Sequence, residues 1–401
     1  MRILIVSLYY PPDLSAGSFR TGALVEQLKK RLRPGDTIRV ITTQPNRYAS
    51  FRTLVPALEE EDGISVERVE LPAHSSRFVD QSRAFLHFAR QALRRTRRER
   101  PDLVYATSSR LMTAALGAVL ARRTGARLYL DIRDLFTDTM GDLLTGPMRL
   151  LVPFIRLIER WTFRRADRVN IVSPGFAAHV SQIRGRDDAS VHTNGVDAEF
   201  IEANFASPPN EPSVILYAGN IGEGQGLDQI VPAAARLLAG RYRFRIVGDG
   251  GARPKLERAL QSIGDAGASV ELRGPVGREQ LRQEYRVADI LFLHLNAYKA
   301  FEKVIPSKLF EYAATGKPIL AGIHGTSRAF VERHIANARC FDPCDATGLV
   351  RAVGELDPGI TDRSGFSAQF ARDAIMGRMA DEMVECASSS GHSAPGSISR
   401  S

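Results

Sequence analysis

Short apolar runs alternate with amphipathic segments along nearly the whole chain. Apolar runs of about five residues, bounded by polar or glycine-containing turns, are typical of buried strands, and the longer segments between them have helical periodicity. The predicted strands are residues 2–8, 37–42, 64–70, 102–106, 126–131, 168–172 and 189–193 in the first half, and 213–218, 242–247, 269–273, 289–295, 318–321 and 338–341 in the second. This alternation predicts an α/β protein built from doubly wound parallel sheets, with helices on both faces.

A polar segment in the middle of the chain predicts a boundary between two domains. Asn194-Gly195-Val196-Asp197 is followed by the polar, Pro-rich residues 203–212. A chain of 401 residues is long enough for about two buried cores. We therefore expect two Rossmann-like domains that face each other across a cleft, and a terminal helix that can cross back to the first domain. The expected units are residues 1–200, 201–365, the helix 366–387 and a Ser/Gly-rich disordered tail, 388–401.

Composition and charge narrow the class of function. Hydrophobic residues make up 44% of the chain and charged residues 25%, as in soluble globular proteins, and no apolar run is long enough to predict a transmembrane helix. Met1-Arg2 leads directly into a strand, so we expect no signal peptide. Three cysteines without metal-ligand spacing suggest a reduced, cytoplasmic setting.

The net charge of +9 comes entirely from the first half of the chain. Residues 1–200 carry 31 Lys and Arg against 22 Asp and Glu, whereas residues 201–401 carry 23 of each. Such an excess indicates an anionic partner, which could be nucleic acid, an anionic lipid surface or a phosphorylated acceptor.

Glycine is concentrated in the loops that follow three strands of the second half. Residues 219–226 contain four glycines, and Gly248-Asp249-Gly250 and Gly274-Pro275-Val276 follow the next two strands. Ligands bind beyond the carboxyl ends of parallel strands, where glycine lets the backbone approach a phosphate or a sugar. In the first half, Gly17 stands near the start of a helix after the first strand. The loop 219–226 has neither P-loop nor GxGxxG spacing. A glycine-rich loop alone is usually only a turn, but three in succession favour one shared crevice.

A short helix in the second half combines a cation and a carboxylate at its start. Pro306 and Ser307 predict the beginning of this helix and Gly316 its end. Lys308 lies in the first turn, where the helix dipole disfavours a cation unless an anion is bound there. Glu311 lies on the same helix face. A phosphate against Lys308 and a sugar diol against Glu311 would make a nucleotide-sugar site; the alternative is an exposed Lys–Glu pair on an amphipathic helix.

The order of these motifs resembles glycosyltransferase family 4, whose members have the GT-B fold. The similarity extends over about residues 1–385 and includes the motifs of the second half together with Gly316-Lys317-Pro318. Further matching segments are Tyr9-Tyr10-Pro11-Pro12 with Gly17, Asp131-Ile132-Arg133-Asp134-Leu135, Glu159, Arg165-Ala166-Asp167, Val172-Ser173 and Asn194-Gly195-Val196-Asp197. The most similar branch is that of the bacterial fucosamine-type transferases of O-antigen, capsule and colanic-acid assembly.

The resemblance implies a retaining glycosyltransferase of cell-surface polysaccharide synthesis. It implies a nucleotide-diphosphate sugar as donor, expected to be UDP-linked, a lipid-linked or glycan acceptor, and no metal or other cofactor. The implied catalytic residues are Lys308, Glu311, Asp134 and Arg133. The implied nucleotide-sugar-binding residues are Gly17, Gly219, Asn220, Gly222, Gln225, Gly248, Asp249, Gly250, Gly274, Pro275, Val276, Pro306, Ser307, Lys308 and Glu311.

Two positions that often carry catalytic side chains in this family are different here. The family commonly has two glutamates eight positions apart; Glu311 matches the second, which holds the nucleotide ribose, but the first falls at Lys303. Glu302 is adjacent, but a shift of one residue turns a side chain away. A histidine often follows the strand near residue 130, where this chain has Arg133. Donor positioning here therefore cannot rely on a histidine at that place.

The phosphate-binding loop also differs from the family pattern. Asn220 and Gln225 stand where many members have an arginine and a lysine, so Lys308 becomes the best cation for the leaving diphosphate. Lys308, the helix start and the backbone amides of the loop can stabilise the negative charge that builds up as the glycosyl–phosphate bond breaks. The diphosphate can itself accept the acceptor's proton, and Asp134 or Asp13 can assist; helix capping is the alternative role for these aspartates.

Basic and large apolar residues are mixed in two segments of the first half. A run of arginines, Arg90–Arg100, ends one helix, and residues 148–161 end in the only tryptophan. This composition suits a helix that lies on an anionic membrane surface; the alternative is a core-facing helix with a solvated basic rim. We expect the basic N-terminal domain to make peripheral contact with the inner face of the plasma membrane, where a lipid-linked acceptor lies.

Two alternative functions are each consistent with some features of the sequence. A nucleotide-sugar epimerase would share the fold and the donor cleft, and it would need acid/base residues, for which His294 near a strand end is a single candidate. A nucleic-acid-binding protein would account for the pI of about 9.7. However, aromatic residues are not interleaved with the basic run, and no nucleic-acid-binding motif is present. We therefore do not expect nucleic acid as a partner.

Overall fold

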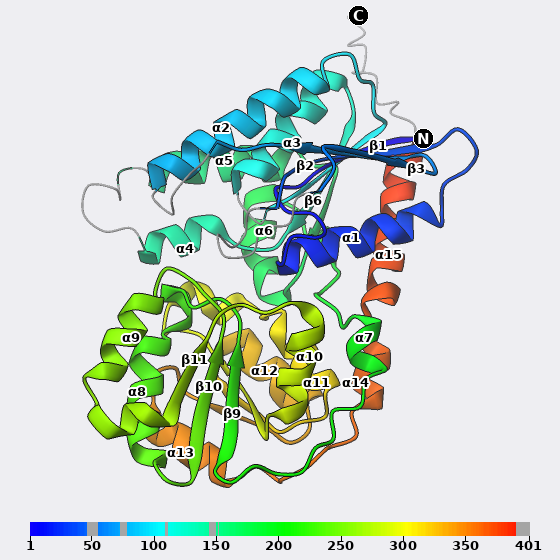
Figure 1. Cartoon of the computed structure of the whole chain (residues 1–401). Coiled ribbons are helices and arrows are strands. Elements are labelled where there is room, and N and C mark those ends of the chain that lie inside the picture. The colour runs from blue at the N-terminus through cyan, green and yellow to red at the C-terminus, as the bar shows by residue number, and fades with distance from the viewer. Residues whose placement is uncertain (46–54, 73–77, 109–110, 144–149, 151, 390–401) are drawn as a thin grey trace, which may run out of the picture.

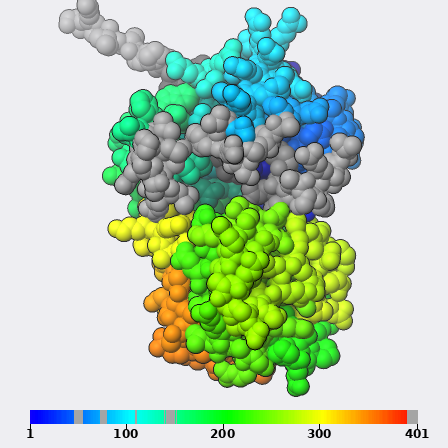
Figure 2. All heavy atoms as spheres, turned by 60° about the vertical axis from the view of Figure 1, so that its left-hand side comes forward, coloured from blue at the N-terminus to red at the C-terminus, as the bar shows by residue number. Residues whose placement is uncertain are grey.

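Two parallel sheets form two bodies, one above the other, in the computed structural model of the chain (Figures 1 and 2). The structure describes residues 1–45, 55–72, 78–108, 111–143, 150 and 152–389. Nearly all of the predicted tail, 388–401, lies outside the described residues. The three cysteines are free, and none of the described helices is both long and apolar enough to cross a membrane.

The N-terminal sheet has eight strands in the order β3-β4-β2-β1-β5-β6-β7-β8. All neighbouring strands are parallel except β3 and β4, which form an antiparallel hairpin. The strands are β1 (Arg2–Val6), β2 (Thr37–Thr43), β3 (Leu58–Glu61), β4 (Ile64–Val69), β5 (Leu103–Thr107), β6 (Arg127–Ile132), β7 (Arg168–Ile171) and β8 (Ser190–Val191). The helices are α1 (Ala16–Lys29), α2 (Phe78–Arg95), α3 (Leu111–Thr124), α4 (Phe136–Leu143), α5 (Val152–Arg165), α6 (Ala177–Arg184) and α7 (Ala198–Ile201).

Side chains of β1 alternate between two cores, as expected for a strand buried on both faces. Ile3 and Ile5 belong to the core that also contains Leu24 of α1, whereas Leu4 and Val6 belong to the core that contains residues of α2 and α3. Figure 1 shows α2, α3 and α5 gathered on one side of this sheet. The sheet is therefore the middle layer of a three-layer α/β sandwich, as the hydrophobic pattern predicted.

Among the described residues, β3 is the one strand that the pattern did not predict. It consists of a leucine and three glutamates, it lies at the edge of the sheet, and its residues are mostly exposed. Asp62 and Gly63, both with positive φ, form the tight turn that leads into β4. An exposed edge strand needs no apolar alternation, so its sequence carries no signal of the kind used for the other strands.

The C-terminal sheet has six parallel strands in the order β11-β10-β9-β12-β13-β14. The strands are β9 (Ser213–Ala218), β10 (Tyr242–Val247), β11 (Val270–Arg273), β12 (Ile290–His294), β13 (Ile319–Gly322) and β14 (Ala338–Phe341). The helices are α8 (Leu227–Leu238), α9 (Arg253–Gln261), α10 (Arg278–Val287), α11 (Lys308–Ala314), α12 (Gly325–His334) and α13 (Ala346–Gly354). The 3-10 turns η3 (Glu223–Gln225) and η5 (Lys299–Lys303) lie in the loops after β9 and β12. This strand order is that of a Rossmann fold, whose ligand crevice lies where the order reverses, between β9 and β12.

The chain crosses between the two bodies twice, at adjacent places. Val196 donates its backbone N–H to the carbonyl oxygen of Phe370 at 2.8 Å, and Arg372 donates to the carbonyl oxygen of Val196 at 2.8 Å. After this second crossing, α15 (Arg372–Ser388) returns to the N-terminal domain and packs across α1 (Figure 1). The prediction that the terminal helix returns to the first domain is confirmed. However, it begins only at Arg372, after the shorter α14 (Ser364–Gln369), because residues 370–372 pair with the first crossing instead of continuing a helix.

Candidate active site

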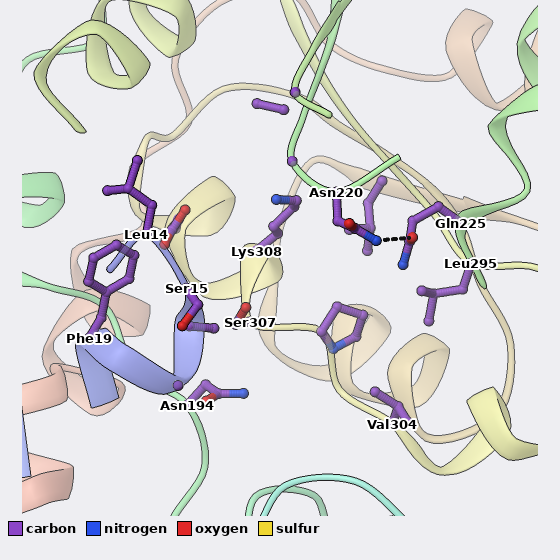
Figure 3. A pocket seen from close by; sticks show the side chains of 18 of the residues that line it. Leu14, Ser15, Phe19, Asn194, Asn220, Gln225, Leu295, Val304, Ser307 and Lys308 are labelled. Atoms are coloured by element: carbon purple, nitrogen blue, oxygen red, sulfur yellow. Dashed lines mark hydrogen bonds between the residues drawn. The ribbon is translucent and has the colours of Figure 1, made fainter. Parts of the chain in front are cut away.

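A cavity of about 590 Å³ lies between the carboxyl edges of the two sheets. One wall comes from the loop after β1, the start of α1 and the loop after β6; the other comes from the loops after β9 to β12 and the start of α11. Figure 3 shows Leu14, Ser15 and Phe19 on the first wall, opposite Lys308 and Asn220 on the second. Both walls lie at the points where strand order reverses, between β1 and β5 and between β9 and β12.

Helix α11 begins at Lys308 and ends before Gly316, which has a φ of +72°, as the sequence predicted. Lys308 extends to Gly219 at the end of β9: a Cβ atom on Gly219 would lie 1.9 Å from the Lys308 Nζ atom. The same ammonium lies 5.8 Å from the centre of the Tyr217 ring. The glycine after β9 therefore leaves the space in which a cation lies at the bottom of the cavity.

Glu311 lies one helical turn after Lys308 and lines the same cavity. The Tyr285 hydroxyl donates a hydrogen bond of 3.1 Å to its Oε2 atom. Burial, together with the charge of Glu311, raises the pKa of Tyr285 well above its usual value, so this hydroxyl stays protonated and remains a donor. The carboxylate of Glu311 is thereby held in one orientation.

The Gln225 side chain holds the loop after β9 together through hydrogen bonds, in a loop where many family members carry an arginine and a lysine. The Oε1 atom of Gln225 accepts hydrogen bonds from the Asn220 side chain at 3.0 Å and from the Gly222 backbone at 3.1 Å (Figure 3). Gly248 and Gly250 pack against this loop: a Cβ atom on Gly248 would lie 1.8 Å from the Gly219 carbonyl oxygen, and one on Gly250 would lie 2.4 Å from that of Ile221. These two glycines are thus required for loop-on-loop packing.

The predicted site residues divide into two groups. Those that line the cavity are Gly17, Arg133, Asp134, Gly219, Asn220, Gln225, Gly248, Pro275, Val276, Pro306, Ser307, Lys308 and Glu311. Those that do not line it are Gly222, Asp249, Gly250 and Gly274. Asp249 instead accepts a hydrogen bond of 2.8 Å from the Gly250 backbone, which closes a local turn. A strand-end glycine motif therefore predicts the right loops, but only part of each loop faces the ligand space.

Arg133 and Asp134 follow β6 on the first wall. The Arg133 guanidinium donates a hydrogen bond of 3.1 Å from Nη1 to the Ala16 carbonyl oxygen. Burial and the neighbouring Arg20 lower the pKa of Arg133, against the opposing effect of Asp131 and Asp134. Asp134 is exposed at the cavity mouth.

Asp131 and Asp13, two other aspartates of the N-terminal domain, do not line the cavity. Asp131 is fully buried and pairs with the fully buried Arg20 at 2.7 Å. It also accepts hydrogen bonds from Tyr105 and Asn170. Asp13 is buried and does not line the cavity. Neither is placed to act on a substrate.

Lys303, at the position of the missing glutamate, connects the two domains. Its ammonium lies 2.6 Å from the Asp138 carboxylate of α4, and its carbonyl oxygen accepts a hydrogen bond from Ser173. Glu302 is exposed, does not line the cavity, and lies 3.9 Å from His324. The side chain of Glu302 is directed away from the site, as the one-residue shift predicted.

Arg278 and Phe19 are among the cavity-lining residues that were not predicted from the sequence. Arg278, the first residue of α10, pairs with Asp197 and Glu199 and lies 4.2 Å from the centre of the Phe19 ring. A basic residue at the start of an ordinary charged helix gives no sign of this contact with the opposite domain. Arg278 and Phe19 are far apart in the sequence and come together only when the chain folds.

His294, the acid/base candidate of the epimerase alternative, is fully buried. Its Nδ1 atom is 2.6 Å from the Gln225 carbonyl oxygen, and its Nε2 atom accepts a hydrogen bond of 2.9 Å from the Cys344 backbone. Burial lowers the pKa of His294 to about 4. The ring is a neutral connector between loops, so the geometry does not favour proton transfer by His294. No cluster of three or more His, Cys, Asp or Glu side chains suited to a metal occurs among the described residues.

Two family models match consecutive parts of the chain. The model described as a glycosyl transferase 4-like domain matches residues 17–196, and the model described as glycosyl transferases group 1 matches residues 212–356. The chain is 28% identical over 387 residues to the putative colanic acid biosynthesis glycosyl transferase WcaI of Escherichia coli, covering 88% of this chain and 91% of the relative. It is 25% identical over 410 residues to the D-inositol 3-phosphate glycosyltransferase of Streptomyces coelicolor, covering 92% and 86%.

Solved structures share the fold of this chain over nearly its whole length. HepE of Anabaena in complex with UDP matches with a TM-score of 0.63 at 17% identity, covering 96% of this chain and 100% of that chain. WaaG, a glycosyltransferase involved in lipopolysaccharide biosynthesis, matches with a TM-score of 0.59 at 14% identity, covering 98% and 96%. The α,α-trehalose-phosphate synthase of Burkholderia xenovorans in complex with glucose-6-phosphate matches with a TM-score of 0.68 at 14% identity, covering 96% and 99%. These likenesses confirm the predicted GT-B fold.

Proposed function

Because this chain belongs to the family 4 glycosyltransferases of GT-B fold, we propose that it moves a sugar, with retention of anomeric configuration, from a UDP-linked donor to a lipid-linked or glycan acceptor in cell-surface polysaccharide synthesis. The relative WcaI is named for colanic acid biosynthesis and WaaG for lipopolysaccharide biosynthesis, and HepE was solved with UDP. One observation in this chain carries the proposal: Lys308 and Glu311, one helical turn apart, line the cavity between the two domains.

Lys308 and Glu311 bind different parts of the nucleotide in this proposal. In the proposal, the Lys308 ammonium, beside Gly219, binds the diphosphate, and Glu311 accepts hydrogen bonds from the ribose hydroxyls. The Tyr285 hydroxyl, which donates to the same carboxylate, keeps it oriented toward the ribose. A charge-assisted hydrogen bond of either kind contributes about 1.5–3 kcal/mol.

The chemistry follows from where charge develops. Breaking the bond between the sugar carbon and the diphosphate oxygen leaves the electron pair on the diphosphate, where Lys308 and the amides at the end of β9 stabilise it. The acceptor hydroxyl attacks the sugar carbon on the same face and gives its proton to a diphosphate oxygen, which retains the configuration. In the proposal no metal or other cofactor takes part, and Asp134 and Arg133 lie on the acceptor side.

Substitution of the two donor-binding side chains tests this proposal. We expect Lys308→Ala and Glu311→Ala each to weaken UDP binding by about tenfold or more, since each loses an interaction of about 1.5–3 kcal/mol. Both should remove most transferase activity without unfolding the protein. Calorimetric titration with UDP and with GDP measures the affinities and identifies the nucleotide, and circular dichroism checks folding.

Matched controls come from the same region. Lys299→Ala and Glu302→Ala remove a lysine and a glutamate from η5 that are exposed and do not line the cavity, and both should bind UDP like the original protein. If folded Lys308 and Glu311 variants also kept native UDP affinity, the proposed donor site would be wrong.

Proton NMR of the glycosidic product would show whether the anomeric configuration is retained or inverted. Interconversion of the donor sugar without acceptor would instead favour an epimerase.

Peripheral membrane contact is the second part of the proposal, and α5 provides its basis. Phe154 and Leu157 are both 66% exposed, and Leu150, just before the helix, is 75% exposed. Arg156 and Arg160 are exposed on the same helix. α3 packs against both α2 and α5, so the arginines that end α2 belong to the same side of the domain (Figure 1). An apolar stripe flanked by arginines suits the headgroup region of an anionic cytoplasmic leaflet.

Liposome binding tests this second part. We expect the protein to sediment with phosphatidylglycerol vesicles at low salt, and Phe154→Ser with Leu157→Ser to lower the bound fraction severalfold, because each apolar side chain contributes about 1.5–3 kcal/mol when buried. Leu237→Ser, on exposed Leu237 of α8 in the other domain, is the matched control. Equal binding to neutral and anionic vesicles, or no effect of the α5 substitutions, would contradict membrane attachment through this helix.

A further inference from the structure

On the wall of the cavity that belongs to the N-terminal domain, one cation forms no ion pair with any described residue. Arg133 lines the cavity, and its guanidinium makes one hydrogen bond, to the Ala16 carbonyl oxygen. Among the residues that the structure describes, Arg133 forms no ion pair within 4.0 Å. The buried carboxylate of Asp131, two residues earlier in the chain, already binds Arg20 through both oxygens, at 2.7 and 3.0 Å, and also accepts hydrogen bonds from Tyr105 and Asn170.

The surroundings of Arg133 favour a bound anion. Burial and the charge of Arg20 both oppose the charged guanidinium and lower its pKa, and Asp131 and Asp134 compensate only in part. A single backbone carbonyl needs only a neutral donor, so the hydrogen bond to Ala16 does not explain why an arginine is placed here. A carboxylate or phosphate would supply the missing negative charge and would match the planar fork of the guanidinium.

The other cations of the cavity are accounted for. Lys308 is assigned to the diphosphate in the proposed function, and Arg278 pairs with Asp197 and Glu199. Arg133 lies on the wall opposite the one that holds Lys308 and Glu311. It therefore faces the part of the substrates that is not the nucleotide: the transferred sugar or the acceptor.

We propose that Arg133 binds an oxyanion, a carboxylate or phosphate, carried by the donor sugar or by the acceptor. This inference rests on the proposed function and specifies its substrate class: at least one substrate bears negative charge apart from the nucleotide. The positive excess of residues 1–200 favours such a substrate by attracting it to this domain. The two sources of the anion are a uronic-acid donor and an acceptor with a phosphate or acidic sugar.

The first experiment tests the donor as the source. Affinities for UDP, UDP-glucose and UDP-glucuronic acid are measured by calorimetry for the original protein and for Arg133→Gln, Arg133→Lys and Arg168→Gln. Arg168, exposed at the amino end of β7, lies at the opposite edge of the sheet and is the charge-matched control. If the donor carries the anion, UDP-glucuronic acid binds about tenfold tighter than UDP-glucose, and Arg133→Gln removes this preference. Arg133→Lys should retain part of it, and Arg168→Gln all of it.

The second experiment tests the acceptor as the source. With UDP at saturation, binding of farnesyl phosphate is compared with that of farnesol, and that of glucuronic acid with that of glucose, in the same variants. If the acceptor carries the anion, the charged member of a pair binds about tenfold tighter, and Arg133→Gln removes the difference. A positive result in either experiment supports the inference and identifies the source.

Two results would overturn the inference. One is that no charged ligand in either experiment depends on Arg133. The other is that Arg133→Gln weakens UDP itself as much as it weakens the charged ligands, because Arg133 would then serve the leaving diphosphate. Failure of the proposed function is recognised separately, as native UDP affinity in the Lys308 and Glu311 variants. Circular dichroism of each variant excludes loss of folding as the cause.

Discussion

Individual residues shape the donor side of the cavity largely through the absence of side chains. Gly219 has a φ of +149°, and its missing Cβ atom leaves the space occupied by the Lys308 ammonium. Gly248 has a φ of +148°, and its missing Cβ atom leaves space for the carbonyl group of Gly219. The absent Cβ atom of Gly219 therefore makes room for the flexible end of a side chain, whereas that of Gly248 makes room for rigid backbone. This difference predicts different consequences of the same substitution.

We expect Gly219→Ala to lower UDP affinity about tenfold and to cost about 1–3 kcal/mol of stability, because the backbone conformation is strained for alanine and Lys308 must move. Gly248→Ala should cost more stability than Gly219→Ala, since the β9 loop itself must shift. Urea unfolding measures stability, and calorimetry measures UDP affinity of the folded protein. A Gly219→Ala variant with native affinity would show that the position of the ammonium is unimportant.

At the scale of elements, α15 attaches the end of the described chain to the N-terminal domain. Glu382 accepts hydrogen bonds from Tyr129 at 2.9 Å and from Ser190, and lies 2.9 Å from His192. Burial opposes the ionised form of Glu382, but the hydrogen bonds from His192, Ser190 and Tyr129 outweigh it and lower the pKa of this carboxyl below its usual value of 4.5. The ionised carboxylate thus helps to hold α15 against β6 and β8.

Stability should consequently fall in acid in a way that depends on Glu382. Because the pKa of Glu382 is lower in the folded chain than in the unfolded chain, its contribution is complete above about pH 4.5 and disappears as the pH falls through the lower value. Urea unfolding between pH 6 and pH 3.5 should show a steeper loss in the original protein than in Glu382→Gln. If the free energy of unfolding fell equally with pH in the two proteins, the Glu382 carboxylate would not be a source of the pH dependence.

For the whole molecule, a small number of contacts set how the two domains face each other. Phe19 and Arg278 line both the main cavity and a second cavity of about 420 Å³ beside it. The Arg278 guanidinium lies 4.2 Å from the centre of the Phe19 ring, which belongs to the opposite domain. Asp197, on the first crossing of the chain, pairs with Arg278 at 2.6 Å and with Arg372, which follows the second crossing. Arg278 thus connects both crossings to the wall of the active site.

We expect Arg278→Met to loosen the domain arrangement and to lower UDP affinity severalfold, because it leaves Asp197 and Glu199 without this cation and removes the contact with Phe19. Small-angle X-ray scattering should show a larger radius of gyration than for the original protein when UDP is bound. Arg286→Met, on an exposed residue of the same helix, is the control. An unchanged scattering curve would show that Arg278 does not hold the domains together.

The sequence predicted the site to different extents in different elements. Lys308 and Glu311 were predictable because helix periodicity places residues three apart on one face, whatever the fold. Glycine motifs predicted the loops after β9, β10 and β11, but not which glycines face the cavity: Gly248 lines it, whereas Gly250 only packs against the loop after β9. Arg278 was not predictable, because its partners come from elements far apart in the chain.

The sequence by itself determined the alternation of strands and helices, the division into two sheets, and the carboxyl-edge loops that carry the chemistry. Local patterning is sufficient there, because strand and helix periodicity reflect which face of each element is buried. Only the tertiary structure decided that Asp131 is a buried partner of Arg20 while Arg133, two residues later, faces the cavity. The sequence predicted that the terminal helix returns to the N-terminal domain, but only the tertiary structure showed that α15 packs on α1 there. Such outcomes depend on packing between elements distant in the chain, and no local sequence pattern encodes that packing.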